Sequence, residues 1–297
     1  MYQTPSPVIT GRLRLRTVAM MLVTAVIAGA CTSSSSKSSS PTTTVTTAAA
    51  PTTTTAPPVA TLTKESEVSP IYRQGLARVS NGWIFSGNRW LAHTDDALHQ
   101  TSFNDHAITP EWMAKGYDHI GDIDVIGATL YAPYEQPNFD LGHQATAIYD
   151  AKTLRFISAV VVKQHENSFV TVDPSTMIAY SLDHFGGDEL FRYDAEKDWA
   201  PLAPLKMSRF VDRVQGADIA DGAAWLSTDD ATKGLYRVDL ATGHVDALGS
   251  LGYPKGEGEG IDATPLPTGL LHALIISPNL APVYLHDYRV GPKATPQ

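Results

Sequence analysis

The stretch Lys255-Gly-Glu-Gly-Glu-Gly-Ile-Asp262 decides how the whole chain is interpreted, because weaker versions of it recur upstream. In each version a polar residue lies shortly before a short apolar strand. The landmarks are Gln74, Asp122, Glu166, Gln215 and Glu259, at steps of 48, 44, 49 and 44 residues. A period of this length, with β-rich sequence between the landmarks, is typical of a β-propeller. Five landmarks predict five blades.

The sequence between landmarks predicts four strands. After each landmark comes a short apolar strand, a turn, and a second strand. Asn81-Gly82 and Asp221-Gly222 are the clearest turns, since both central residues of such a dipeptide tolerate positive φ. A third strand usually ends in an aspartate that opens the next turn by bonding its own backbone, and a fourth strand follows. The pattern predicts an all-β fold, a five-bladed β-propeller of four-stranded antiparallel blades.

The last period lacks a fourth strand before the chain ends. Propellers commonly close by taking a strand from the other terminus, so residues 59–63 are predicted to pair in the last blade. Helix is nearly absent from the pattern. Thr109-Pro110-Glu111 has a capping threonine followed by proline at the first helical position, which predicts one or two turns over residues 110–116.

Residues 1–30 are predicted to be a lipoprotein signal peptide. An arginine-rich start precedes the apolar run Thr17–Ala30, which at 14 residues is shorter than the roughly 20 that span a bilayer. Cys31 follows directly and resembles the lipidation site of bacterial lipoproteins; ordinary cleavage and secretion is the alternative. Cys31 is the only cysteine in the chain, so none is left for a disulfide or a zinc site.

Three further segments follow the signal peptide. Residues 31–62 are almost entirely Ser, Thr, Pro and Ala, which predicts a disordered tether. Residues 63–291 suit one β-propeller domain, and residues 292–297 form a short tail. We therefore expect a monomeric, extracytoplasmic domain, held at the cell membrane of a bacterium through lipid on Cys31.

The charge is unevenly distributed along the chain. Residues 1–62 hold four basic and no acidic residues, so residues 63–297 carry 31 acidic against 18 basic side chains, a formal charge of −13. No basic run or RNA-binding signature occurs, which argues against nucleic acid as a partner. An acidic body does not adhere to anionic lipid, so any membrane attachment would be covalent. Nucleophile-elbow, P-loop and zinc-protease motifs are also missing.

The predicted topology brings polar residues to one mouth of the central channel. In an up-and-down blade, the start of the first strand and the end of the second lie on the same face. Among the side chains expected there, we predict catalytic roles for Asp122, Glu166, Glu259, His119 and His165. We predict ligand contacts for Gln74, Gln215, Asp218, Arg213, His184 and Glu135.

Carboxylates gathered without basic partners repel one another, which raises their pKa values and favours a bound cation or a shared proton. Calcium accepts six to eight oxygen ligands in irregular geometry, so Asp122, Glu166, Asp218 and Glu259 suit it better than zinc. The alternative is that these residues only satisfy buried backbone groups around a water-filled channel. Each histidine could equally be a general acid or base or bond a neighbouring blade, and Arg213 could bind a ligand or simply pair with acids.

Two short motifs resemble known propeller families. Tyr72-Arg-Gln-Gly-Leu76 resembles the Gln-Gly-Leu opening of the plant-type and bacterial glutaminyl cyclases, which are five-bladed propellers. Glu259-Gly-Ile-Asp262 is similar to blade starts of extracellular propeller hydrolases of the phytase-like and lactonase-like kinds. The cyclases have a catalytic glutamate in a Gly-Glu-Gly-Ile segment at the second blade start, where this chain has Gly121-Asp122-Ile-Asp124. The resemblance implies that Asp122, one methylene shorter, would take that role.

Three functions are consistent with this sequence. The leading hypothesis is a propeller anchored in the cell envelope that binds a small ligand or a cation at an acidic central face. The second is an extracytoplasmic enzyme, either a metal-assisted hydrolase or a glutaminyl-cyclase-like acyltransferase. The third is a scaffold for protein interactions, since propellers host unrelated functions.

Overall fold

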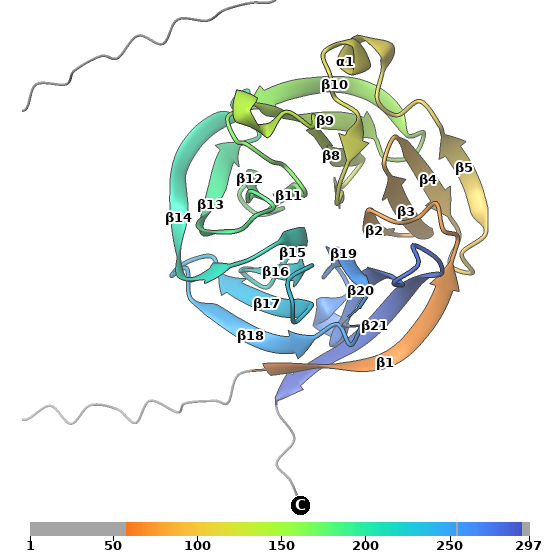
Figure 1. Cartoon of the computed structure of the whole chain (residues 1–297), viewed down its shortest axis with the longest axis vertical. Coiled ribbons are helices and arrows are strands. Elements are labelled where there is room, and N and C mark those ends of the chain that lie inside the picture. Colours follow the sequence, from red (N-terminus) through yellow and green to blue (C-terminus); the bar gives the residue numbers. More distant parts are fainter. Residues whose placement is uncertain (1–57, 254, 293–297) are drawn as a thin grey trace, which may run out of the picture. The chain divides into compact units, whose positions relative to one another are not determined.

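The computed structural model describes residues 58–253 and 255–292, which form five antiparallel sheets arranged in a ring (Figure 1). The predicted five-bladed β-propeller is confirmed. The predicted signal peptide, Cys31 and most of the predicted tether lie outside the described residues, as does the tail from residue 293. No helix in the described part of the chain has the length and hydrophobicity needed to cross a membrane.

Each blade runs from an innermost strand at the centre of the ring to an outermost strand at its rim, and three blades use four consecutive strands. Blade 1 consists of β2 (Gly75–Val79), β3 (Gly82–Gly87), β4 (Trp90–Thr94) and β5 (Gln100–Asn104). Blade 3 consists of β11 (Thr171–Val172), β12 (Ile178–Ser181), β13 (Gly187–Asp194) and β14 (Ala200–Val211). Blade 4 consists of β15 (Val214–Ala220), β16 (Ala223–Thr228), β17 (Gly234–Asp239) and β18 (Val245–Ser250).

In blade 2 the innermost strand is interrupted. Its two parts both pair with β8, and Asp122, in the gap between them, forms an isolated parallel bridge with Phe169 of blade 3. The gap therefore places Asp122 between two blades. The strands of blade 2 are β6 (His119–Ile120), β7 (Asp124–Ile126), β8 (Thr129–Glu135), β9 (Gln144–Asp150) and β10 (Arg155–Val162).

The N-terminal strand of the described chain closes the ring. Its residues pair antiparallel with the last strand, from Pro58 opposite Pro292 to Val68 opposite Val283. The predicted pairing of residues 59–63 is confirmed, and the strand begins inside the range assigned to the tether. Blade 5 thus consists of β19 (Glu257–Asp262), β20 (Leu270–Ile276), β21 (Val283–Pro292) and β1 (Pro58–Val68).

The apolar core is divided into five clusters, one at each interface between neighbouring blades. Trp225 of blade 4, for example, packs with Ile261 and Leu271 of blade 5. The predicted helix over residues 110–116 is observed as α1 (Pro110–Ala114), whose Trp112 packs against the core between blades 1 and 2. The short 3₁₀ turns η1 (Phe139–Leu141) and η2 (Leu266–Thr268) complete the described elements. Apolar side chains fill the interfaces between blades, and the buried polar side chains of Asp124, Asp218 and Asp262 come from innermost strands.

Candidate functional site

The carboxylate of Asp122 joins four blades at the centre of the ring. Its Oδ1 accepts hydrogen bonds from the backbone N–H groups of Leu76 (3.1 Å) and Ile123 (3.0 Å). Its Oδ2 accepts from Ala217 and Ile261, each at 3.1 Å. Burial raises the pKa of Asp122 well above its usual value, while the backbone N–H groups oppose that rise. Both oxygens are thus used to hold strands together.

Glycines on the neighbouring innermost strands make room for this carboxylate. A Cβ atom on Gly75 would lie 2.5 Å from Cα of Asp122, and one on Gly216 would lie 2.5 Å from its Oδ2. A Cβ atom on Gly260 would clash with its Oδ1. Side chains at these positions would displace Asp122, so the glycines are required by close approach to a side chain.

The residues that directly precede Asp122 and these glycines form a ring one level nearer the mouth of the channel. This ring differs from the predicted ring of five polar residues at two positions. Asp122 and Glu166 were expected in the ring, but Gly121 and Ser168 occupy those places. Asp122 lies one level deeper, and Glu166 is held beside blade 3 by its own contacts. The ring consists of Gln74, Gly121, Ser168, Gln215 and Glu259. The first four of these residues follow one another in the sequence at intervals of 47 residues.

This ring borders a pocket of about 260 Å³, which we call the acidic mouth. Its other lining residues come mainly from the ends of second strands and the loops beyond them, as the topology predicted. They are His119, Glu135, Phe139, His184 and Glu257. Among the described residues, three carboxylates therefore line the acidic mouth, and no lysine or arginine does.

Glu259 is the most enclosed of these carboxylates. It is buried, yet no hydrogen bond from the described chain reaches either of its carboxylate oxygens. Burial raises its pKa well above the usual value, and the charges of Glu257 and Asp229 add to the rise. Arg73 opposes the rise through its positive charge. The carboxylate oxygens of Glu259 open onto the acidic mouth, where water or a bound ligand can donate to them.

Glu135 and Glu166 lie side by side where blades 2 and 3 meet. Glu135 accepts a hydrogen bond from the backbone N–H of Asn167 at 2.6 Å, and Glu166 accepts one from that of Phe185 at 2.8 Å. Burial raises the pKa of Glu135 to about 7, and the charges of Glu166 and Asp183 contribute. Burial also raises the pKa of Glu166. Glu135 is therefore partly protonated near neutral pH.

The three predicted histidines divide between the acidic mouth and its surroundings. His119 lines the mouth, and Asn88 donates to its Nδ1 at 3.3 Å. His184 also lines the mouth, and burial lowers the pKa of both His119 and His184. His165 is exposed and donates from Nδ1 to the carbonyl of Phe139 at 2.8 Å. At neutral pH the mouth thus contains neutral imidazoles beside carboxylates.

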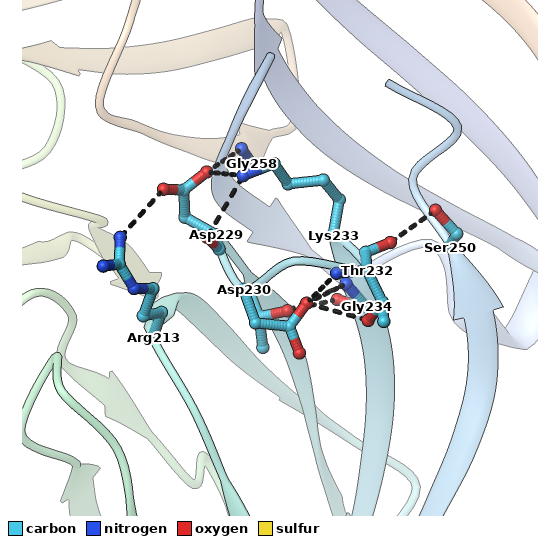
Figure 2. Close-up of polar contacts among 9 residues, drawn as sticks. Arg213, Asp229, Asp230, Thr232, Lys233, Gly234, Ser250 and Gly258 are labelled. Atoms are coloured by element: carbon cyan, nitrogen blue, oxygen red, sulfur yellow. Dashed lines mark hydrogen bonds and ion pairs between the residues drawn. The ribbon is translucent and has the colours of Figure 1, made fainter. Parts of the chain in front are cut away.

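Arg213, a predicted ligand contact, lies outside the lining and belongs to an ion-pair network on blades 4 and 5 (Figure 2). Its guanidinium is 3.8 Å from Asp229, whose other oxygen contacts the Lys233 ammonium at 2.6 Å. The backbone N–H of Gly258 also donates to Asp229, at 3.3 Å. The network fixes the loop before β17 against the start of β19, which carries Glu257 and Glu259.

A second carboxylate layer lies deeper along the channel. Asp124, Asp218 and Asp262 are buried, and each accepts a backbone N–H from the next blade around the ring. For Asp218 the donor is Ala263 at 2.6 Å. Burial raises the pKa of all three, and the charge of Asp218 adds to the rise for the other two. Asp218, expected at the mouth, therefore lies below Asp122 and is used between blades.

The four predicted calcium ligands do not meet at one point. Asp122 and Asp218 bond backbone groups at deeper levels, Glu166 bonds Phe185, and only Glu259 lines the acidic mouth. Among residues 58–253 and 255–292, no group of three or more His, Cys, Asp or Glu side chains is placed to hold a metal ion.

The sequence analysis assigned no role to four residues of the mouth, Gly121, Ser168, Phe139 and Glu257. The signal for the first two was present, because Gln74, Gly121, Ser168 and Gln215 follow one another at equal steps. The predicted landmarks Asp122 and Glu166 were selected for their acidic side chains, although Gly121 and Ser168 keep the equal interval. Phe139 lies in a loop between strands and has no periodic signal.

Comparison with known proteins supports the fold. No family model matches the chain, and no curated protein matches its sequence. Among solved structures, the glutaminyl cyclase of Myxococcus xanthus superposes with a TM-score of 0.59 at 13% identity, over 80% of this chain and 99% of that one. The hydrazine synthase of Kuenenia stuttgartiensis gives a TM-score of 0.45 at 12% identity, over 77% of this chain and 65% of that one. At such identities the likeness to the cyclase is one of fold.

Proposed function

We propose that the acidic mouth binds a small organic ligand through a protonated amino group. The observation that carries this proposal is Glu259, a buried carboxylate that receives no hydrogen bond from the described chain and lines the pocket. An ammonium group carries up to three donors and a compensating positive charge. It would supply what the carboxylate lacks, and Glu135 and Glu257 would strengthen the attraction.

The size and the amides of the pocket narrow the ligand further. A volume of about 260 Å³ is slightly below the range of about 300–1,000 Å³ that holds drug-sized molecules, which favours a ligand of amino-acid size. Gln74 and Gln215 each offer an amide donor and acceptor to its polar groups. We favour an organic cation over calcium, because calcium needs six to eight oxygens converging on one point.

A calorimetric titration with L-glutaminamide tests this proposal, with N-acetyl-L-glutaminamide as the uncharged counterpart. We expect binding of the amine only, and at least a tenfold loss of affinity in Glu259→Gln. Glu67→Gln, an exposed carboxylate on β1, is the matched control and should bind as the wild type does. Equal binding of the acetylated compound, or unchanged affinity in Glu259→Gln, would exclude the proposal. A parallel titration with calcium chloride separates a metal site from an amine site.

A second candidate is an enzyme that acts on such an amine by acid–base chemistry. Glu135, with a pKa of about 7, and the neutral His119 line the same pocket, so a proton donor and a proton acceptor coexist there at neutral pH. In glutaminyl cyclisation the unprotonated α-amine nitrogen bonds to the side-chain amide carbon, the amide C–N bond breaks, and ammonia leaves. His119 would take the proton from the amine, and Glu135 would give one to the departing ammonia.

Ammonia release from a peptide with N-terminal glutamine distinguishes this enzyme from a binding protein. Turnover that is lost in both Glu135→Gln and His119→Gln, with substrate affinity retained in His119→Gln, is the expected result for an enzyme. Binding without ammonia release would leave the first proposal standing and would eliminate the cyclase.

We also propose that the protein is a monomer attached to the outer face of the membrane by lipid on Cys31. The apolar run before Cys31 and the polar segment after it support this attachment. Metabolic labelling with an alkyne fatty acid should label the wild type and not Cys31→Ser. Label on the serine variant would contradict the proposal.

A further inference from the structure

A larger cavity lies between blades 1 and 2, at the end of the ring opposite the acidic mouth. Its volume is about 690 Å³, within the range of small-molecule sites. The turns after β2, β7 and β9 and the outer strands β4 and β5 border it on the surface of the ring. The polar side chains that line it are Ser80, Asn81, His93, Thr101, Ser102 and Lys152. Asn104 joins the two blades nearby by donating to the carbonyl of Leu154 at 2.8 Å.

Thr101 contacts His93 at two points. Its Oγ1 lies 3.0 Å from the backbone carbonyl oxygen of His93 and 2.8 Å from Nδ1 of the ring. When the single hydroxyl hydrogen points to the carbonyl, which can only accept, Nδ1 carries the ring hydrogen and donates it to Thr101. In this tautomer Nε2 is an acceptor, and it has no hydrogen-bond partner within the described chain. Burial lowers the pKa of His93, which keeps the ring neutral.

A β-bulge produces this contact. His93 pairs with Ser102, and Thr94 pairs with Gln100, so Thr101 is an extra residue in the edge strand β5. Bulges of this kind re-aim a side chain and are common near functional sites. Here the bulge brings the Thr101 hydroxyl to the imidazole and orients the ring.

The lining chemistry differs from that of the acidic mouth. Within residues 58–253 and 255–292, the lining consists of three hydroxyl groups, one amide and one neutral imidazole, with Lys152 as its single charge and no carboxylate. The lining has no negative charge to stabilise a cation, and the lone pair of Nε2 would repel an anion. A neutral ligand is therefore favoured. A ligand hydroxyl can donate to Nε2 and accept from Asn81 or Lys152 at the same time.

We propose that the cavity between blades 1 and 2 is a second binding site, which takes a neutral, hydroxyl-rich molecule of mono- or disaccharide size. The site is separate from the acidic mouth, and its occupancy does not depend on what the mouth binds. His93 accepts from the ligand, and Thr101 is a positioning residue that sets the tautomer.

Titration of ¹⁵N-labelled protein with D-glucose and with sucrose tests the site, with sodium phosphate and methylammonium chloride as charged probes. We expect saturable shifts of the His93 ring and the Asn81 amide with at least one of the sugars. Two-bond ¹⁵N correlations should show His93 protonated at Nδ1. Shifts with phosphate or methylammonium and not with sugar would overturn the proposal, as would a ring protonated at Nε2.

Thr101→Val isolates the positioning role, because it removes the hydroxyl and keeps the branched side chain of an exposed strand residue. We expect at least tenfold weaker sugar binding and loss of the single His93 tautomer, with an unchanged melting temperature. Thr268→Val is the matched control, since it also removes a hydroxyl bonded to a carbonyl, in the distant η2. Should Thr101→Val bind sugar as tightly as Thr268→Val does, the proposed role of the tautomer is wrong.

Discussion

The Oδ2 atom of Asp122 accepts a hydrogen bond from the backbone N–H of Ile261, 139 residues further along the chain, at 3.1 Å. The same carboxylate binds N–H groups of Leu76 and Ala217, so a single side chain joins strands of blades 1, 2, 4 and 5. These donors are buried, and water does not replace the carboxylate without opening the centre of the ring. The residue that the cyclase resemblance suggested as catalytic is thus tied to the stability of the ring.

Replacing Asp122 by asparagine should destabilise the fold strongly. The amide would turn an NH₂ group toward two of the four backbone donors and leave them unsatisfied, at about 1–3 kcal/mol each. We expect the free energy of unfolding in urea, followed by tryptophan fluorescence, to fall by about 3 kcal/mol or more. Asp140→Asn, at an exposed position, is the control. A midpoint equal to that of the control would show that Asp122 does not hold the ring.

The glycines around Asp122 should tolerate no side chain. In Gly216→Ala the new Cβ would lie 2.5 Å from Oδ2 of Asp122, so we expect a loss of about 1–3 kcal/mol in the free energy of unfolding. Gly291→Ala is the matched control, because nothing lies within 4 Å of its added Cβ. It should change stability by less than about 0.5 kcal/mol. Equal urea midpoints for the two variants would contradict the close approach described here.

Binding of an amine at the acidic mouth should strengthen as the pH rises through about 7. Glu135 has a pKa of about 7 because of its burial, so below that pH it is mostly neutral and attracts an ammonium group less. Calorimetric titrations with L-glutaminamide between pH 5.5 and pH 7.5 measure this dependence, because an α-amino group has a pKa of about 7.7–8.0 and stays mostly protonated there. In Glu135→Gln the affinity should rise less over the same range. A wild-type affinity that rises no more than that of the variant would be incompatible with this role.

The deeper carboxylate layer should make the protein less stable at alkaline pH. Burial raises the pKa of Asp262 to about 8, and its Oδ1 is buried without a hydrogen-bond partner in the part of the chain that the structure describes. The folded state therefore holds a proton that the unfolded state releases near pH 4, and stability falls as the pH rises between these values. Asp262→Asn keeps an oxygen for the Arg78 N–H and cannot ionise, so its unfolding free energy should vary less between pH 5 and pH 9. Parallel curves for variant and wild type would argue against a retained proton.

Much of the architecture could be predicted from the sequence because it rests on local chemistry. Asp221-Gly222 forms a turn with φ values of 51° and 70°, as its residue types require. Blade closure followed from a missing strand in the last period, and β1 supplies it. The set of side chains at the mouth was predicted less well. Gln74, Gln215 and Glu259 were placed correctly in the ring, and Asp122 and Glu166 were not.

The sequence by itself determined that this chain makes five similar β units, because turn dipeptides and apolar runs act over a few residues at a time. Only the tertiary structure decided which level of the channel each acid occupies. A shift of one residue along a strand turns a side chain to the other face. The true register depends on contacts such as Asp122 with Leu76 and Ile261, which are 46 and 139 residues away. No local pattern records those contacts, since they exist only when the blades meet at the centre of the ring.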